Sequence, residues 1–296
     1  MEENGSDSIT QPQALRNILY CLLGCTPTLF RLINNKEVLI FLFWLPGILV
    51  EVVLALYLAV RFLRASNIWL LFDSFAVTTI LSIAALALNT LFVVALVKIS
   101  GDQGFLFSDT PFSWLTAILY LLMLFQVAFT EETVKYIAVM RGNLSSLKNF
   151  VAQAVAVGAG FAIAEQSNQM LDLYYFSKRA WTFSSILIQF LVFLCKSALH
   201  CSTAVFIAFR MVSVPTNFSF LHRFVYIIWI PLCYHFFCNI LIQSEDFILE
   251  ERYSLVVHAC TLPLLVLVAV YFIFKTNHSQ LLEQSYSSLA EGFVIR

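Results

Sequence analysis

The chain has few charged residues, and this scarcity excludes most classes of soluble protein. Only 12% of its 296 residues are Asp, Glu, Lys or Arg, against about 25% in a typical soluble domain. Hydrophobic residues make up 60% of the chain, including 29 Phe, and the mean hydropathy is +0.84. A water-soluble core would be too small to hold so much apolar surface. The composition therefore predicts a multi-pass integral membrane protein in contact with the lipid bilayer.

The sequence also has no excess of basic charge, and we expect no cleavable leader in it. Its formal net charge is −1, which gives no support for a nucleic-acid partner. The first thirteen residues are polar and mildly acidic, with no basic segment before an apolar run, so they do not form a signal peptide. We expect residues 1–15 to form a disordered polar tail and residues 276–296 to form a polar C-terminal tail.

Long apolar segments recur between these tails. A membrane-spanning helix needs about 20 apolar residues, and seven segments meet this requirement: 37–63, 72–98, 112–140, 149–172, 182–212, 221–243 and 254–274. Residues 16–34 contain Arg16, Pro27 and Arg31, which favours an interfacial or re-entrant helix as an eighth membrane element. The connections are short, so the fold class predicted for residues 16–275 is all-α, a single transmembrane bundle of about seven spans.

The orientation of this bundle does not follow from the sequence. Lys and Arg residues near the span ends divide almost evenly between the two sides, which leaves the positive-inside rule little to act on. Asn-x-Ser sequons begin at Asn4, Asn143, Asn217 and Asn277. The last three fall on one side of the expected bundle, but the motif is common by chance.

Acidic and imidazole side chains interrupt four successive spans. Glu131 and Glu132 are adjacent in the 112–140 segment, and Glu165, His200 and His235 occupy the next three segments. A charged side chain in hydrocarbon costs about 2.5–3.5 kcal/mol on insertion scales. A chain keeps such groups only where the interior of the bundle compensates them.

The depths of these groups agree. With a rise of about 1.5 Å per residue, Glu131 lies about 13 Å from the face where its span ends, and Glu165 lies about 24 Å from that face. His200 and His235 each lie about 20 Å from it. All four fall in the central part of a hydrocarbon layer about 30 Å thick. Antiparallel helices would therefore bring them into one pocket.

Several chemical roles follow for the acidic pair. Two carboxylates in close contact cannot both ionise cheaply, which is the usual environment of a general acid or base. Glu131 and Lys135 are four residues apart and can pair on one helix face. Glu132 points to a different face and can meet another partner.

The later groups suggest a metal or water site. Glu165, His200 and His235 form a familiar ligand set for a catalytic Zn²⁺ with one position open for water. The same side chains could instead hold a water without a metal. Asn239 follows His235 by one helical turn and could donate a hydrogen bond to a developing oxyanion.

These residues match the motifs of a known family. The matching elements, in chain order, are Glu131-Glu132-x-x-Lys135, Gly160-Phe161-Ala162-x-x-Glu165, a single His200, and His235-x-x-x-Asn239. Together they resemble the PrsW-type intramembrane proteases, in the superfamily of CAAX prenyl endopeptidases and bacteriocin-processing enzymes. The resemblance covers about residues 110–245, which would form the catalytic core. Gln166 and Phe236 depart from it, because the family usually has Asn and Gly at these positions.

The resemblance implies an intramembrane endopeptidase, a hydrolase that cleaves a membrane-protein substrate within or near the bilayer. It implies that Glu131 or Glu132 activates a water, and that Glu165, His200 and His235 position that water or a metal. Two other functions remain open. Intramembrane acids and imidazoles also form proton relays in transporters and channels, although the chain shows no internal repeat of the kind common in transporters. A non-catalytic scaffold that binds transmembrane segments is the third.

Overall fold

The structure is a computed structural model that describes residues 11–24, 49, 52–61, 68–100, 114–142, 147–176, 183–214, 218–243 and 271. Its elements within these residues are all helices: α1 (Gln11–Gly24), a short helix Val52–Arg61, α4 (Ile68–Ser100), α5 (Trp114–Met140), α6 (Leu147–Phe176), α7 (Phe183–Ser213) and α8 (Phe220–Gln243). Helices α4 to α8 are each long and apolar enough to cross a membrane. The protein is therefore a helical, multi-pass membrane protein, as its composition predicts.

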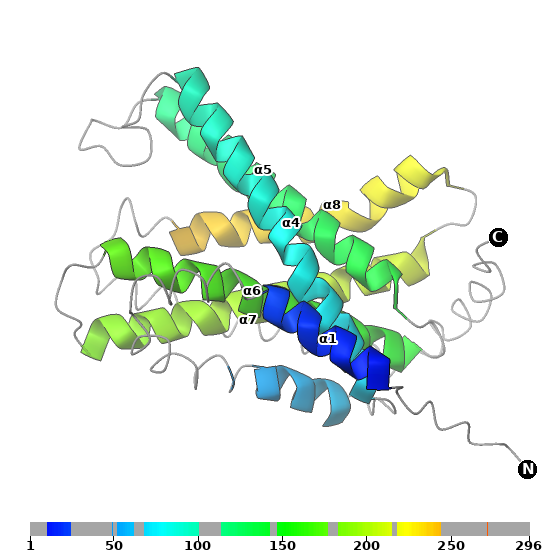
Figure 1. The fold of residues 1–296 in the computed structure, drawn as a ribbon. Coiled ribbons are helices and arrows are strands. Elements are labelled where there is room, and N and C mark those ends of the chain that lie inside the picture. Colours follow the sequence, from blue (N-terminus) through cyan, green and yellow to red (C-terminus); the bar gives the residue numbers. More distant parts are fainter. Residues whose placement is uncertain are drawn as a thin grey trace, which may run out of the picture.

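Helix α6 is the centre of the bundle. It packs mainly against α4 and α7, while α5 packs against α4 and α8, and α8 also contacts α7. Helices α6, α7 and α8 run roughly alongside one another, and α4 and α5 cross them as a tilted antiparallel pair (Figure 1). In the apolar window of α6, 89% of residues are buried, compared with 17% in α4. An apolar helix that is buried on all sides is expected at the centre of a membrane bundle, and a span with wide apolar exposure is expected to face lipid.

Five of the predicted spans are confirmed as helices. The segments predicted at 72–98, 112–140, 149–172, 182–212 and 221–243 correspond to α4 through α8, with ends that differ by no more than four residues. The predicted spans at 37–63 and 254–274 lie largely outside the described residues, as do residues 1–10, 25–34 and the C-terminal tail. Helix α1 begins at Gln11 and therefore includes residues 11–15, which we assigned to the N-terminal tail.

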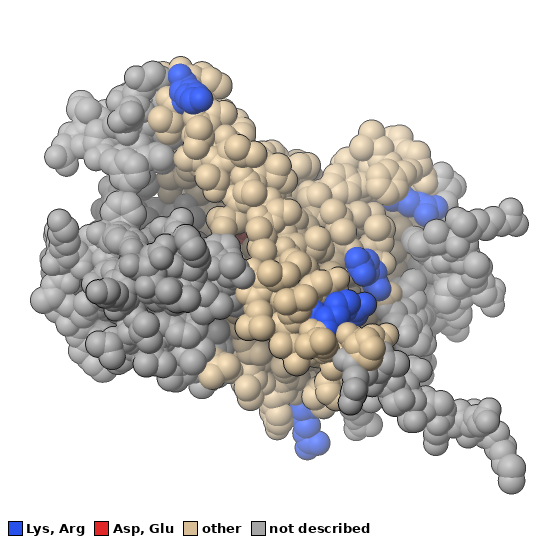
Figure 2. Space-filling view, in the orientation of Figure 1, with Lys and Arg blue, Asp and Glu red and all other residues tan. Residues whose placement is uncertain are grey.

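The surface has the character expected of a protein in lipid. Leu, Ile, Val, Phe and Trp side chains are exposed along α4, α5 and α8, with Leu91, Leu115 and Trp229 each more than half exposed. Figure 2 shows broad areas without charge, between which Lys and Arg atoms occur only in separate small groups. Such an apolar surface would be an aggregation hazard in water, whereas lipid chains satisfy it.

Two glycines allow α6 to touch its neighbours backbone to backbone. A Cβ atom on Gly158 would lie 2.4 Å from the Cα of Cys201 and 2.5 Å from the carbonyl oxygen of His200 on α7. A Cβ atom on Gly160 would lie 2.4 Å from the carbonyl oxygen of Phe75 on α4. Small residues at helix contacts give membrane bundles their close packing. Gly158 therefore sets the distance between α6 and α7 at the level of His200.

We expect Gly158→Ala to destabilise the bundle, because its added methyl group meets backbone that cannot rotate away. Overpacking of this kind costs about 1–3 kcal/mol, which thermal unfolding in detergent should report as a lower Tm. Ser213→Ala, at an exposed position near the end of α7, is the control and should leave the Tm nearly unchanged. An unchanged Tm in Gly158→Ala would contradict the close contact.

Candidate intramembrane glutamate and histidine site

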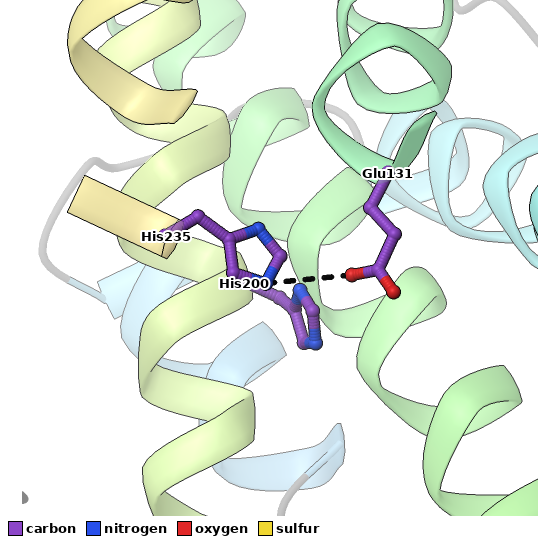
Figure 3. Close-up of side chains that lie close together, drawn as sticks. All are labelled: Glu131, His200 and His235. Atoms are coloured by element: carbon purple, nitrogen blue, oxygen red, sulfur yellow. Dashed lines mark ion pairs between the residues drawn. The ribbon is translucent and has the colours of Figure 1, made fainter. Parts of the chain in front are cut away.

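Three helices bring one carboxylate and two imidazoles together inside the bundle. Glu131 lies on α5, His200 on α7 and His235 on α8, and each is at most 4% exposed. One possible ligand atom from each residue lies within 4.8 Å of the others. The two imidazole ring centres are 5.3 Å apart, and Nε2 of His235 is 3.5 Å from Oε2 of Glu131. Figure 3 shows the three side chains pointing toward one another from their separate helices.

Glu132 fixes the orientation of His235. Its Oε1 atom accepts hydrogen bonds from Nδ1 of His235 and from Nζ of Lys135, each at 2.5 Å. Lys135 also donates to Oγ1 of Thr203 on α7 at 3.0 Å. Because an ionised carboxylate only accepts hydrogen bonds, the proton of His235 is assigned to Nδ1. Nε2, which faces Glu131, is then left as an acceptor or metal ligand.

Glu165 holds His200 in a matching way. Its Oε2 atom lies 2.5 Å from Nε2 of His200, and its Oε1 atom accepts a hydrogen bond from Nζ of Lys196 at 2.9 Å. Nδ1 of His200 is buried and has no hydrogen-bond partner. The side chain of Glu165 is 19% exposed, whereas those of the two histidines are 1% exposed. Glu165 is therefore the more accessible edge of the site.

The site thus contains two Lys–Glu–His chains that flank Glu131. We call Lys135–Glu132–His235 the α5–α8 chain and Lys196–Glu165–His200 the α6–α7 chain. Among the described residues, no Lys or Arg forms an ion pair with Glu131. Buried charges persist where they are paired and hydrogen-bonded. Glu132 and Glu165 are compensated in this way, and Glu131 is the carboxylate of the three that has no Lys partner among the described residues.

The group that could hold a metal differs from the expected one. We predicted Glu165, His200 and His235 as ligands, but the structure brings Glu131 together with the two histidines. Glu165 instead contacts His200 through Nε2 and is shared with Lys196. Depth alone does not distinguish Glu131 from Glu165, because both lie near the centre of the membrane on neighbouring helices. A Glu and two His are a common set of protein ligands for a catalytic Zn²⁺.

Buried polar atoms without partners fit such a ligand. Oε2 of Glu131 and Nδ1 of His200 are buried without a hydrogen bond. An orphaned buried polar group costs about 1–3 kcal/mol. A metal ion or a water held at this point would satisfy both atoms, so the residues fit either ligand.

The contacts of the two lysines and Asn239 differ in part from those expected from the sequence. Lys135 pairs with Glu132, not with Glu131 as we expected, because the three-residue spacing brings its Nζ atom to that carboxylate. Lys196 pairs with Glu165. Asn239 is buried one turn beyond His235, but among the described residues it bonds to none of the site's Glu or His side chains.

Both departures from the family motifs have packing roles. Nε2 of Gln166 donates to the carbonyl oxygen of Phe193 and to Oγ of Ser197, each at 2.9 Å, which joins α6 to α7. The ring of Phe236 packs edge-on against Phe125, with centroids 5.8 Å apart, which joins α8 to α5. These residues therefore contribute to the helix contacts that carry the site.

Two residues of the site were not identified from the sequence as part of it. Phe161 lies against His200, with ring centres 5.0 Å apart, and its ring is 5.1 Å from Nζ of Lys135. Thr203 accepts the hydrogen bond from Lys135. The position of Thr203, three residues after His200 on the same helix face, is a signal that could have identified it. Phe161 belongs to the Gly160-Phe161-Ala162-x-x-Glu165 element, and its place in that element is the signal that could have identified it.

We expect Lys135→Met to destabilise the protein strongly, because it leaves Glu132 buried without its cation. Removing one partner of a buried pair costs about 3–5 kcal/mol. Arg16→Met is the matched control, since Arg16 pairs with Asp73 where both side chains are partly exposed and such pairs contribute at most about 1 kcal/mol. Chemical unfolding in detergent measures the free energy of unfolding of both variants. Equal losses of unfolding free energy in the two variants would show that Lys135 does not compensate the buried charge of Glu132.

Comparison of the chain with models of protein families, with curated proteins and with solved structures finds no match.

Proposed function

We propose that the protein is an intramembrane endopeptidase of PrsW type that hydrolyses a peptide bond of a membrane-protein substrate within or near the bilayer. The observation that carries the proposal is the position of Glu131, a buried carboxylate between two imidazoles that are each oriented by their own Lys-paired glutamate. The proposal also includes the seven spans expected from the sequence, of which α4 to α8 are five.

The residues would act in the following way. Glu131 accepts a proton from a water held between His200 and His235, and the water oxygen attacks the carbonyl carbon of the substrate. The proton then passes to the leaving amine, so that the amide C–N bond breaks and an acid and an amine form. A carboxylate that takes and returns a proton in this way contributes about 10²–10⁴-fold to the rate. Asn239 is placed on the α8 face next to His235 and would contact the carbonyl oxygen if the substrate approaches from that side.

The net negative charge of the site favours binding of a cation. Three carboxylates and two ammonium groups leave one uncompensated negative charge when the histidines are neutral. Glu131, His200 and His235 would hold a divalent metal, which would supply Lewis-acid polarisation of the carbonyl and a more acidic water. The α5–α8 and α6–α7 chains would then orient the two histidines.

Access also favours a substrate from the membrane. A helical amide is protected by its own hydrogen bond, and a polar cavity is needed to unwind it at bilayer depth. Glu165 is the partly exposed member of the site, and it gives an extended segment a polar group to approach.

We expect Glu131→Gln to abolish cleavage while leaving the fold intact, because the amide keeps the shape of the side chain but cannot accept the proton. The assay uses the full chain reconstituted in vesicles with a library of quenched fluorescent apolar peptides. Asp73→Asn, in the exposed pair with Arg16, should retain full activity.

Cleavage that continues in Glu131→Gln would exclude Glu131 as the base. If the unchanged chain cleaves no peptide but carries protons in a Glu131-dependent manner, the transporter alternative replaces the protease. If it does neither and still binds apolar helices, the scaffold alternative replaces it.

Metal content tests the ligand set independently. We expect about one equivalent of Zn²⁺ per chain by elemental analysis of the purified protein, and loss of that metal in His235→Ala and in Glu131→Ala. Glu165→Gln should keep the metal but weaken its affinity by about 10–100-fold, as is usual for a residue that orients a ligand. Retention of metal in Glu131→Ala together with its loss in Glu165→Gln would favour the ligand set expected from the sequence.

A further inference from the structure

Two helical hairpins carry their basic residues at the same end of the bundle. Arg141 and Lys148 lie at the connection between α5 and α6, and Arg210 and Arg223 lie near the connection between α7 and α8. The end of α5, the start of α6, the end of α7 and the start of α8 lie at the same end of the molecule in Figure 1. We refer to these four residues as the basic end. The sequence has no Asp or Glu between 140 and 150 or between 209 and 226.

Three arginines of the basic end are each ten to twelve residues from a residue of the buried site. Arg141 follows Glu131 by ten residues, and Arg210 follows His200 by ten residues. Arg223 precedes His235 by twelve residues. At about 1.5 Å per residue these separations are about 15–18 Å. Because Glu131, His200 and His235 meet at one point, the three arginines lie at similar distances along their own helices from the buried site.

That distance equals half the thickness of the hydrocarbon layer, which is about 15 Å. When the buried site lies near the midplane, the basic end therefore lies among the lipid headgroups. Arg210 is held there by a hydrogen bond from its Nε atom to the carbonyl oxygen of Tyr226 at 2.6 Å. Its guanidinium also lies 4.0 Å from the centre of the Tyr226 ring. Tyr at this level is typical of the interface between membrane and water.

The opposite end has a different charge. Lys98 lies in the last turn of α4. In the sequence, Lys178 and Arg179 fall between α6 and α7, and Asp102 and Asp109 fall between α4 and α5. At the basic end, the one acid near the start of α4, Asp73, is already paired with Arg16. The basic end thus presents cations without acids in its two hairpin connections, and the opposite end mixes the two.

We propose that the basic end contacts anionic phospholipid headgroups and faces the cytoplasm. Anionic lipids are concentrated in the cytoplasmic leaflet, where each nearby Lys or Arg contributes up to about 1 kcal/mol of attraction. The Asn143 and Asn217 sequons lie in the same two connections and therefore carry no glycan.

Lipid selectivity tests the contact with anionic headgroups. The full chain is reconstituted with spin-labelled phosphatidylserine or phosphatidylcholine, and the immobilised fraction of each lipid is compared. We expect preference for phosphatidylserine, reduced several-fold in Arg141→Gln/Lys148→Gln and little changed in Lys98→Gln at the opposite end. Arg141→Gln alone, at an exposed side chain, replaces the double variant if the latter lowers the Tm. No preference, or an equal loss in Lys98→Gln, overturns the proposal.

Accessibility on sealed cells tests the orientation. Ser145→Cys lies between α5 and α6, and Ser108→Cys lies between α4 and α5. An impermeant maleimide should label Ser108→Cys on intact cells and Ser145→Cys only after permeabilisation. The labelling of each variant is compared with that of the unchanged chain. The opposite pattern, or a glycan that Asn143→Gln or Asn217→Gln removes, overturns the proposal. Neither test depends on proteolysis.

Discussion

The hydrogen-bonded ion pair between Lys135 and Glu132 is the interaction on which the rest of the site depends. Both side chains are completely buried, in a segment where an uncompensated charge would oppose membrane insertion. Lys135 also donates a hydrogen bond to Thr203 of α7, and Glu132 also accepts one from His235 of α8. A shift of either helix by one residue would rotate these partners by about 100° and leave the charges unmatched. The pair therefore selects one register for three helices, in addition to any chemical role.

The α6–α7 chain adds a second constraint of the same kind. Lys196 and His200 lie one turn apart on α7, and both meet Glu165 on α6. A polar side chain without a partner within the bilayer costs free energy. Interhelical hydrogen bonds therefore favour one pairing of helix faces over other pairings of similar apolar surfaces. Ala and Gly residues of α6 permit the helices to approach, and the charged groups decide which faces meet. Neither feature alone would specify the position of Glu131.

Much of this arrangement could be predicted from the sequence. Apolar runs gave the positions of α4 to α8, because length and hydropathy are sufficient to recognise a span. The common depth of Glu131, His200 and His235 predicted that they would meet, and they do. Which carboxylate would face the two histidines was not predictable, because depth does not report rotation about a helix axis. The partner of Lys135 was missed for a related reason, since three-residue and four-residue spacings both allow pairing.

The close packing of α6 has a mechanical consequence. On one side of this helix Gly158 touches the backbone of α7 at His200, and two residues later Gly160 touches the backbone of α4 at Phe75. No flexible side chain lies at these two contacts to absorb a displacement. Among the described spans, α4 also has the smallest buried share, 17% of its apolar window. Helices α4, α6 and α7 are thereby in direct backbone contact, so that α4 cannot move toward α6 without displacing the helix that carries His200.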